Sequence, residues 1–299
     1  MEASSIESTK SETSENDVVI EAWNTVLFDK FSKFERVLTS GLSIHSEEAI
    51  ARHPFREGSA VLDVGCGFGD TTRRIAPLLG AKGRAVGVDC ADNFIRRAGD
   101  DAERAGLKNA SFFVADVQSD DLRGPYDRVF ARFGTMFFSL PGAAMRNIRR
   151  ALRPGGELTM VVWRRREDNA WLHEPELRVR AIVPVVSHED SGQVHCGPGP
   201  FSMSGADTVS SLLVAVGFDH ITFERFDANI CIGRDLDEAV QFAMALGPAG
   251  EIIRLAGDEG RRHKSAIDAA MREALAPFVR PDGVWGPSST WIISARNPG

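Results

Sequence analysis

A glycine-rich segment between a predicted strand and a predicted helix constrains this chain more than any other feature. It reads Val61-Leu-Asp-Val-Gly-Cys-Gly-Phe-Gly69. Glycines at such a junction allow a turn that is too tight for side chains and let a ligand touch the backbone. The following helix offers free N–H groups and the positive end of its dipole. The segment therefore predicts an α/β fold with a ligand site at the carboxyl ends of its strands.

Strands and helices alternate around this loop. The predicted strands span 60–64, 84–89, 111–115, 128–132 and 157–163, and the predicted helices span 70–79, 92–105 and 142–152. This alternation implies parallel strands joined by right-handed crossovers. We therefore predict a Rossmann-like, doubly wound sheet.

Five segments make up the predicted domain organisation. Residues 1–17 are mostly Ser, Thr and Glu with little to bury, which is typical of a disordered tail. The other four are an N-terminal helical segment at 18–57, the ligand-binding core at 58–163, a cap or insert at 164–205, and a C-terminal part of the sheet at 206–299. That last part has strand candidates at 221–226 and 290–295 and a helical insertion at 235–280.

Composition excludes several classes of protein and partner. The net charge of −7 argues against nucleic-acid binding, which depends on Lys and Arg neutralising phosphates. No apolar run reaches the roughly 18 residues of a membrane-spanning helix. The four cysteines show neither a CxxC pattern nor metal-like spacing. We therefore predict a cytoplasmic protein without a metal site.

The glycine spacing argues against a dinucleotide site. The dinucleotide fingerprint is G-x-G-x-x-G, whereas here the glycines are 65, 67 and 69, and Asp70 follows. An aspartate at the mouth of the loop repels a pyrophosphate and tolerates an ammonium or a sulfonium. Asp63 adds a second negative charge nearby, so the pattern favours a ligand with a cationic group.

Acidic residues also end the next two predicted strands. Asp89 closes the second strand, where a carboxylate accepts hydrogen bonds from ribose hydroxyls in nucleotide-binding sheets. Asp116 follows the third strand and is placed to accept from an adenine amine, while Val117 is placed to pack on the ring. The three strand ends together suggest an amino-acid-like cation, a ribose and an adenine.

These motifs give residues 60–163 a clear family resemblance. VLDVGCGFG, GVD at 87–89, Ala115-Asp116, Tyr126-Asp-Arg-Val-Phe130 and Arg149-Arg-Ala-Leu-Arg-Pro-Gly-Gly156 resemble a class I S-adenosylmethionine-dependent methyltransferase. The type is the small-molecule one, related to ubiquinone/menaquinone-biosynthesis methyltransferases. The resemblance implies S-adenosylmethionine as the cofactor and a seven-stranded sheet whose last strand is antiparallel. It also implies that the N-terminal helices and the insert close over the cofactor and substrate.

The resemblance also implies a set of cofactor contacts. We expect them from residues at the ends of the first four strands: Asp63, Gly65, Cys66, Gly67, Gly69, Asp89, Cys90, Asp116, Val117 and Arg132. For Arg132, a structural ion pair is the alternative to a ligand contact. For Cys66 and Cys90, small buried thiols are the default interpretation.

The sequence leaves the general base open. His173, shortly after the fifth strand, is the first candidate, and its alternative is a surface or cap histidine. His45, in the N-terminal segment, is the second candidate; it can instead cap a helix or touch the cofactor's carboxylate. Trp163, Trp171, Phe137 and Phe138 gather near the ends of strands four and five, where some can line an apolar acceptor pocket.

The predicted function is methyl transfer to a small, largely apolar molecule through oxygen, carbon or nitrogen. No Asn-Pro-Pro-Tyr or Asp-Pro-Pro-Tyr motif, typical of amino-group methylation on adenine or glutamine, follows the fourth strand. Two alternatives stay open, an NAD(P)-dependent oxidoreductase and a non-catalytic cofactor-binding module. The acceptor and the oligomeric state do not follow from the sequence.

Overall fold

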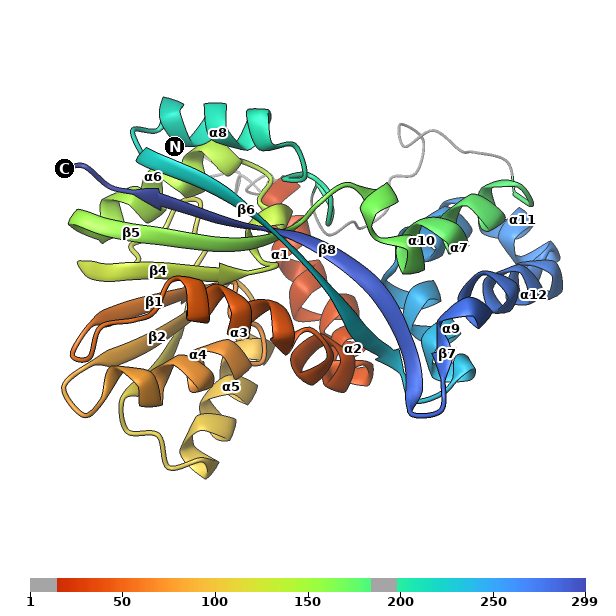
Figure 1. Ribbon diagram of the computed structural model, residues 1–299, viewed down its shortest axis with the longest axis horizontal. Helices are drawn as coiled ribbons and strands as arrows, with labels where there is room; N and C mark the ends of the chain where they lie inside the picture. Colours follow the sequence, from red (N-terminus) through yellow and green to blue (C-terminus); the bar gives the residue numbers. More distant parts are fainter. Residues whose placement is uncertain (1–14, 184–197) are drawn as a thin grey trace, which may run out of the picture.

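A single mixed sheet organises the chain, as the computed structural model shows for residues 15–183 and 198–299 (Figure 1). Its strands run in the order β3-β2-β1-β4-β5-β8-β6, with the short β7 paired to β8. β8 is antiparallel to both β5 and β6, whereas β1 to β5 are parallel. The predicted Rossmann-like sheet with an antiparallel last strand is therefore confirmed. The strand bounds are β1 Ala60–Val64, β2 Arg84–Asp89, β3 Ala110–Val114, β4 Tyr126–Arg132, β5 Leu152–Trp163, β6 Asp219–Gly233, β7 Val279–Arg280 and β8 Gly283–Arg296.

Alternating residues of the central strands fill the layers on both sides of the sheet. Leu62 and Val64 of β1 pack into one apolar cluster with Ile148, whereas Val61 packs into another with Ile75. Strands that are apolar on both faces are expected in a parallel sheet covered by helices. The helices that follow these strands are α4 (Asp70–Ile75, continued by the 3-10 turn Ala76–Leu79), α5 (Asp92–Arg104), α6 (Pro141–Ala151) and α8 (Ala206–Ala215).

β6 and β8 are more than twice as long as the predicted strands at 221–226 and 290–295. They pair with each other from Asp219 opposite Arg296 to Gly233 opposite Val284. The sequence pattern did not predict the full length of these strands, because the ribbon contains polar and turn-forming residues such as Pro287. Pairing between the two strands, rather than strand propensity, stabilises this part of the sheet. The ribbon curves away from the sheet toward the helical lobe at its far end (Figure 1).

That lobe contains the predicted helical insertion. Its helices are α9 (Leu236–Leu246), α10 (Pro248–Leu255), α11 (Gly257–Arg262) and α12 (Lys264–Leu275). α7 (Ala170–Arg180), from the predicted insert at 164–205, packs against α10 and α12. Residues 184–197 of that insert lie outside the described residues. In the described chain, no helix is both long enough and apolar enough to cross a membrane.

The N-terminal segment is more helical than predicted. It consists of α1 (Glu15–Asn24), α2 (Val26–Lys33), a π-helical turn (Val37–Gly41) and α3 (Ser43–Arg52). The predicted disordered tail at 1–17 is wrong for its last residues, because α1 begins at Glu15; residues 1–14 lie outside the described range. An acidic first turn suits a helix N-terminus, and Asn16 is held by residues after β3. Figure 1 shows α1 and α2 standing at the end of β4.

Candidate cofactor site and acceptor region

In the glycine loop after β1, positions 65 and 67 require glycine for different structural reasons. A Cβ on Gly65 would lie 2.9 Å from the Cα of Gly134, so the loop after β4 passes too close for any side chain. A Cβ on Gly67 would meet nothing within 4 Å, and φ of Gly67 is +50°. Gly67 therefore leaves open space in front of its backbone, where a ligand can approach. The third glycine, Gly69, precedes α4 in a left-handed conformation.

Asp89, at the end of β2, faces this loop. One carboxylate oxygen accepts from the N–H of Gly67 at 3.0 Å and the other from the N–H of Ala91 at 3.1 Å. Burial raises the pKa of Asp89, and the backbone N–H donors oppose that rise. The carboxylate is thus fixed beside the open space at Gly67, where it suits a ribose hydroxyl pair.

Asp116, just after β3, is the second carboxylate on this edge. Its Oδ1 accepts from the backbone N–H of Gln118 at 2.9 Å, and its Oδ2 accepts from the side-chain amide of Asn16 at 2.7 Å. The neighbouring Val117 is buried. The residues present therefore fit the sugar and the base of S-adenosylmethionine: a cradle at Gly67 and two acceptor groups at successive strand ends.

Asp63 and Asp70 have protein partners rather than an open ligand face. Arg132, at the end of β4, donates to the Asp70 carboxylate at 2.7 Å, to Thr71 Oγ1 at 3.0 Å and to the carbonyl of Leu38 at 2.9 Å. Asp63 accepts from Thr72 Oγ1 at 2.6 Å, and burial raises its pKa to about 7. The carboxylates beside the open space at Gly67 are therefore Asp89 and Asp116. The prediction that Asp70 offers its charge to the ligand is wrong, because Asp70 is ion-paired with Arg132.

The two cysteines of the site are not nucleophiles. Cys66 is buried and Cys90 is half-buried. Burial raises the pKa of both thiols, and the charge of Asp89 raises it further. Because the thiol form is unreactive, these side chains are suited to packing beside the loop. Among the described residues, no group of His, Cys, Asp and Glu side chains is placed to hold a metal ion.

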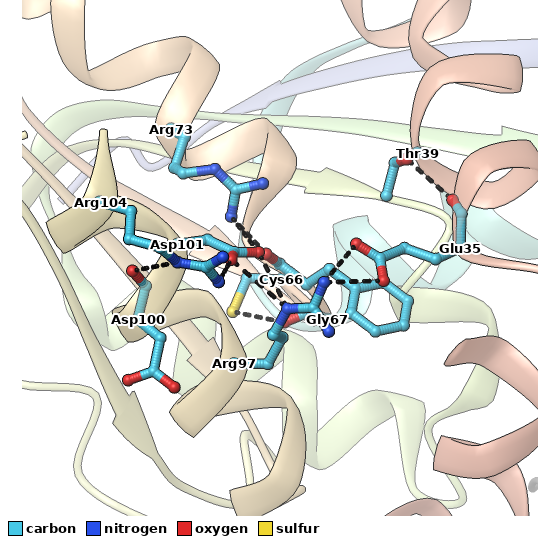
Figure 2. A network of polar contacts seen from close by, with 10 residues as sticks. Glu35, Thr39, Cys66, Gly67, Arg73, Arg97, Asp100, Asp101 and Arg104 are labelled. Atoms are coloured by element: carbon cyan, nitrogen blue, oxygen red, sulfur yellow. Dashed lines mark hydrogen bonds and ion pairs between the residues drawn. The ribbon is translucent and has the colours of Figure 1, made fainter. Parts of the chain in front are cut away.

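A charged network ties the N-terminal segment to the loop. Figure 2 shows Arg97 of α5 between Glu35 and Asp101, with N–O distances of 3.2 Å to each. Arg73 of α4 donates to the carbonyl of Phe68 at 2.6 Å and lies 3.7 Å from Asp101. Sequence analysis did not identify these residues, because nothing in the local pattern marks a pairing between residues 35 and 97.

His45 lies in the core, with no exposed surface. Its Nε2 lies 2.9 Å from Ser288 Oγ, and its Nδ1 lies 3.2 Å from Thr290 Oγ1, both on β8. Because Ser288 donates its own hydrogen to the carbonyl of Ala228, it accepts from Nε2–H. The Thr290 hydroxyl lies 3.2 Å from Nδ1 and also 3.2 Å from the carbonyl of Phe226, so its single hydrogen is shared between these two acceptors. Burial and, to a smaller extent, the charge of Arg132 lower the pKa of His45 to about 3. A role as general base would require one of these hydrogen bonds to break.

His173 is half-buried on α7, and its surroundings differ from those of His45. Its Nδ1 is buried and has no hydrogen-bond partner among the described residues. The backbone N–H of His173 donates to the carbonyl of Asn169, and Asn169 joins this turn to β8 through Ser289. His173 thus keeps a nitrogen that can accept a proton.

Aromatic rings pack against one another beyond the ends of β4 and β5, and Trp163, Trp171 and Phe242 among them are buried. Phe133 stacks on Trp163 with 4.3 Å between the ring centroids, and Trp171 stacks on Phe242 with a centroid distance of 5.7 Å. Trp163 and Trp171 meet edge-on, with their ring centroids 6.3 Å apart. Phe133 itself has a φ of 59°, an unusual conformation for a bulky residue and one found at functional sites. Nearby, Phe137 meets Trp23 of α1 edge-on at 5.1 Å. Trp163 and Trp171 therefore lie together and are joined by Phe242 of the helical lobe, whereas Phe137 contacts Trp23 of the N-terminal segment.

Comparisons with known proteins agree with this geometry. Residues 61–156 match the family model described as a methyltransferase domain. The chain is 24% identical over 228 residues to the ubiquinone/menaquinone biosynthesis C-methyltransferase UbiE of Pseudomonas savastanoi, covering 73% of this chain and 88% of the relative. A similar relative, UbiE of Pseudomonas aeruginosa, is 25% identical over 183 residues, which are 58% of this chain and 71% of that protein.

Solved structures share the fold. The YcgJ protein of Bacillus subtilis superposes with a TM-score of 0.55 at 16% identity, covering 86% of this chain and 99% of that one. Phosphoethanolamine N-methyltransferase 2 of Haemonchus contortus, solved with phosphomonomethylethanolamine and S-adenosylhomocysteine, gives 0.55 at 14% identity, covering 96% and 61%. The dinucleotide-dependent alternative is not favoured by any of these matches. Residues 61–156 thus match a methyltransferase domain, and the findings together support a class I S-adenosylmethionine-dependent methyltransferase related to the ubiquinone/menaquinone-biosynthesis methyltransferases.

Proposed function

We propose that this enzyme methylates a small, largely apolar molecule at the carboxyl edge of β4 and β5. The observation that carries the proposal is the row of aromatic side chains from Phe133 through Trp163 and Trp171 to Phe242. Small-molecule sites are built mostly from such side chains with few polar groups. The C-methyltransferase relative acts in ubiquinone and menaquinone biosynthesis, which supports a carbon acceptor on an apolar molecule. A cytoplasmic location remains our prediction.

In this proposal the cofactor lies along the ends of β1, β2 and β3. S-adenosylmethionine supplies a methyl group that its sulfonium has already activated. Asp89 accepts from the ribose hydroxyls, Asp116 accepts from the adenine amine, and Gly67 lets the backbone approach the ligand. The remaining predicted contacts support this loop: Asp63 holds Thr72 at the start of α4, and Arg132 holds Asp70 and Thr71. The chain therefore acts mainly by positioning and by excluding water.

His173 is the proposed proton acceptor where the acceptor atom must lose a proton. Its buried Nδ1 has no partner among the described residues, whereas both nitrogens of His45 are engaged. A base is needed only for an acceptor that stays protonated until attack. His173→Gln should therefore lower kcat for a hydroxyl acceptor more than for an acidic carbon acceptor, and equal losses with both would remove this role.

Calorimetric titration with S-adenosylhomocysteine tests the cofactor assignment. Asp89→Asn keeps the shape of the side chain but loses its charge, and a hydrogen bond to a charged group is worth about 1.5–3 kcal/mol, so affinity should fall about tenfold to 150-fold. Asp92→Asn is the matched control, because its carboxylate is exposed on α5 and pairs with Arg96. Equal affinity of the Asp89→Asn variant and the wild type would refute the assignment.

A further inference from the structure

Asn16 of α1 makes a two-point contact with the end of β3. Its Nδ2 donates to Asp116 Oδ2 at 2.7 Å, and its Oδ1 accepts from Gln118 Nε2 at 2.8 Å. The partners fix the orientation of both amides. A carboxylate only accepts, and the Gln118 carbonyl oxygen is already used by the N–H of Leu140 at 2.6 Å. Asn16 therefore presents one donor and one acceptor side by side to this strand end.

This donor and acceptor pair has the chemistry of an adenine edge. Adenine carries an exocyclic amine, which donates, next to a ring nitrogen, which accepts. A carboxamide carries an NH₂ group next to a carbonyl oxygen in the same order. A strand end that accepts from the amine of Asn16 and donates to its carbonyl is therefore equipped to receive the edge of an adenine.

We propose that Asn16 is an internal adenine mimic, seated in the adenine subsite until the cofactor displaces it. The inference rests on the proposed function, in which Asp116 accepts from the adenine amine. Asn16 occupies both the Asp116 carboxylate and the Gln118 amide, so an adenine edge that used the same acceptor and donor would have to displace it. Asn16 is half-buried and lies in the first turn of α1, so its side chain can leave by rotation while the rest of the helix stays packed.

Contacts farther along α1 hold the helix in place independently of Asn16. Asn93 of α5 donates to the carbonyl of Asn24 at 2.6 Å, and Trp23 lies edge-on to Phe31 and Phe137, each at 5.1 Å. Val19 and Ala22 of α1 are buried. The plug at Asn16 is therefore a local feature at one end of an anchored helix.

Removing the plug should tighten the binding of adenine-containing ligands. A protein whose binding-competent form is only partly populated has its apparent affinity reduced by that fraction. Both hydrogen bonds are partly exposed and water replaces them when Asn16 leaves, so the net contribution of the contact is that of one ordinary hydrogen bond, which corresponds to a population shift of about three- to tenfold. If Asn16 instead contacted the bound cofactor, its removal would weaken binding. The direction of the change in affinity therefore distinguishes a competing side chain from a cofactor contact.

The experiment is calorimetric titration of the full chain with S-adenosylhomocysteine and, separately, with adenosine. Asn16→Ala and Asn16→Asp should each lower Kd about three- to tenfold for both ligands, the second because a carboxylate beside Asp116 is repelled. Glu21→Gln, on an exposed position of the same helix, should leave both constants unchanged. Unchanged or weaker binding by the folded Asn16 variants would overturn the mimic while leaving the cofactor assignment intact. Failure of the wild type to bind either ligand would refute the proposed function itself.

Discussion

The buried imidazole of His45 predicts a pH dependence of stability with a definite sign. In the folded chain its pKa is lowered to about 3, first by burial and then by Arg132, from an ordinary value of 6.5. At pH values between these two pKa values, His45 is protonated in the unfolded chain but neutral in the folded chain. Stability from this group is therefore complete above about pH 6.5 and is lost as the pH falls toward 3.

The size of the effect follows from the two pKa values. At pH 5 the unfolded imidazole is almost fully protonated and the folded one is not, so lowering the pH from 7 to 5 removes about 2 kcal/mol of the free energy of unfolding. No discount for solvent screening applies, because His45 has no exposed surface. This loss is a large fraction of the 5–15 kcal/mol that is typical of a folded protein.

The assay is urea unfolding at pH 7 and pH 5, at one ionic strength, for the wild type and His45→Gln. Glutamine keeps a donor and an acceptor for Ser288 and Thr290 but does not titrate. All other titrating groups are common to both proteins, so they cancel in the difference. The wild type should lose about 2 kcal/mol more than the variant over this interval. Equal losses would show that His45 titrates near its ordinary pKa, and the structural role assigned to it would be refuted.

Three further predictions concern the loop and its supports. Gly67→Ala should weaken S-adenosylhomocysteine binding in calorimetry and should lower Tm only by the strain of its φ of +50°, because its Cβ meets no protein atom within 4 Å. Gly65→Ala also has a positive φ and its Cβ in addition meets Gly134, so it should lower Tm more than Gly67→Ala does; the reverse order of the two Tm values would contradict this geometry. Asp63→Asn should gain stability relative to the wild type as the pH rises from about 4 to 7 in urea unfolding, because a raised carboxyl pKa of about 7 makes the charged form unfavourable in the fold. If the difference in free energy of unfolding between the variant and the wild type did not change with pH, the raised pKa of Asp63 would be refuted. Gly286→Ala should lower the free energy of unfolding by about 1–3 kcal/mol, since its Cβ would lie 2.6 Å from the Trp171 ring; an unchanged value would mean that Trp171 moves freely.

The sequence predicted the sheet core because its signals are local. The glycines at 65, 67 and 69 and the acids Asp89 and Asp116 each stand at the end of an apolar run, so their placement follows from strand bounds alone. The resemblance then supplied the antiparallel last strand, which the pairing of β8 with β5 and β6 confirms.

Features that depend on distant pairing were not predictable in the same way. The partners of His45 lie on β8, more than 240 positions away in the chain, and Asn16 meets Asp116 across 100 positions. From the sequence, the Asp70 carboxylate was expected to face a cationic ligand group, but in the structure it is ion-paired with Arg132. Such contacts are set by tertiary packing, and no local pattern of residue types encodes them.

We infer that the strand ends of β1, β2 and β3 bind an adenosyl sulfonium donor rather than a dinucleotide. Equilibrium dialysis of the full chain against S-adenosylmethionine and NADH, each alone and in competition, measures this directly. We expect saturable binding of S-adenosylmethionine that NADH does not displace. Saturable binding of NADH with none of S-adenosylmethionine would contradict it.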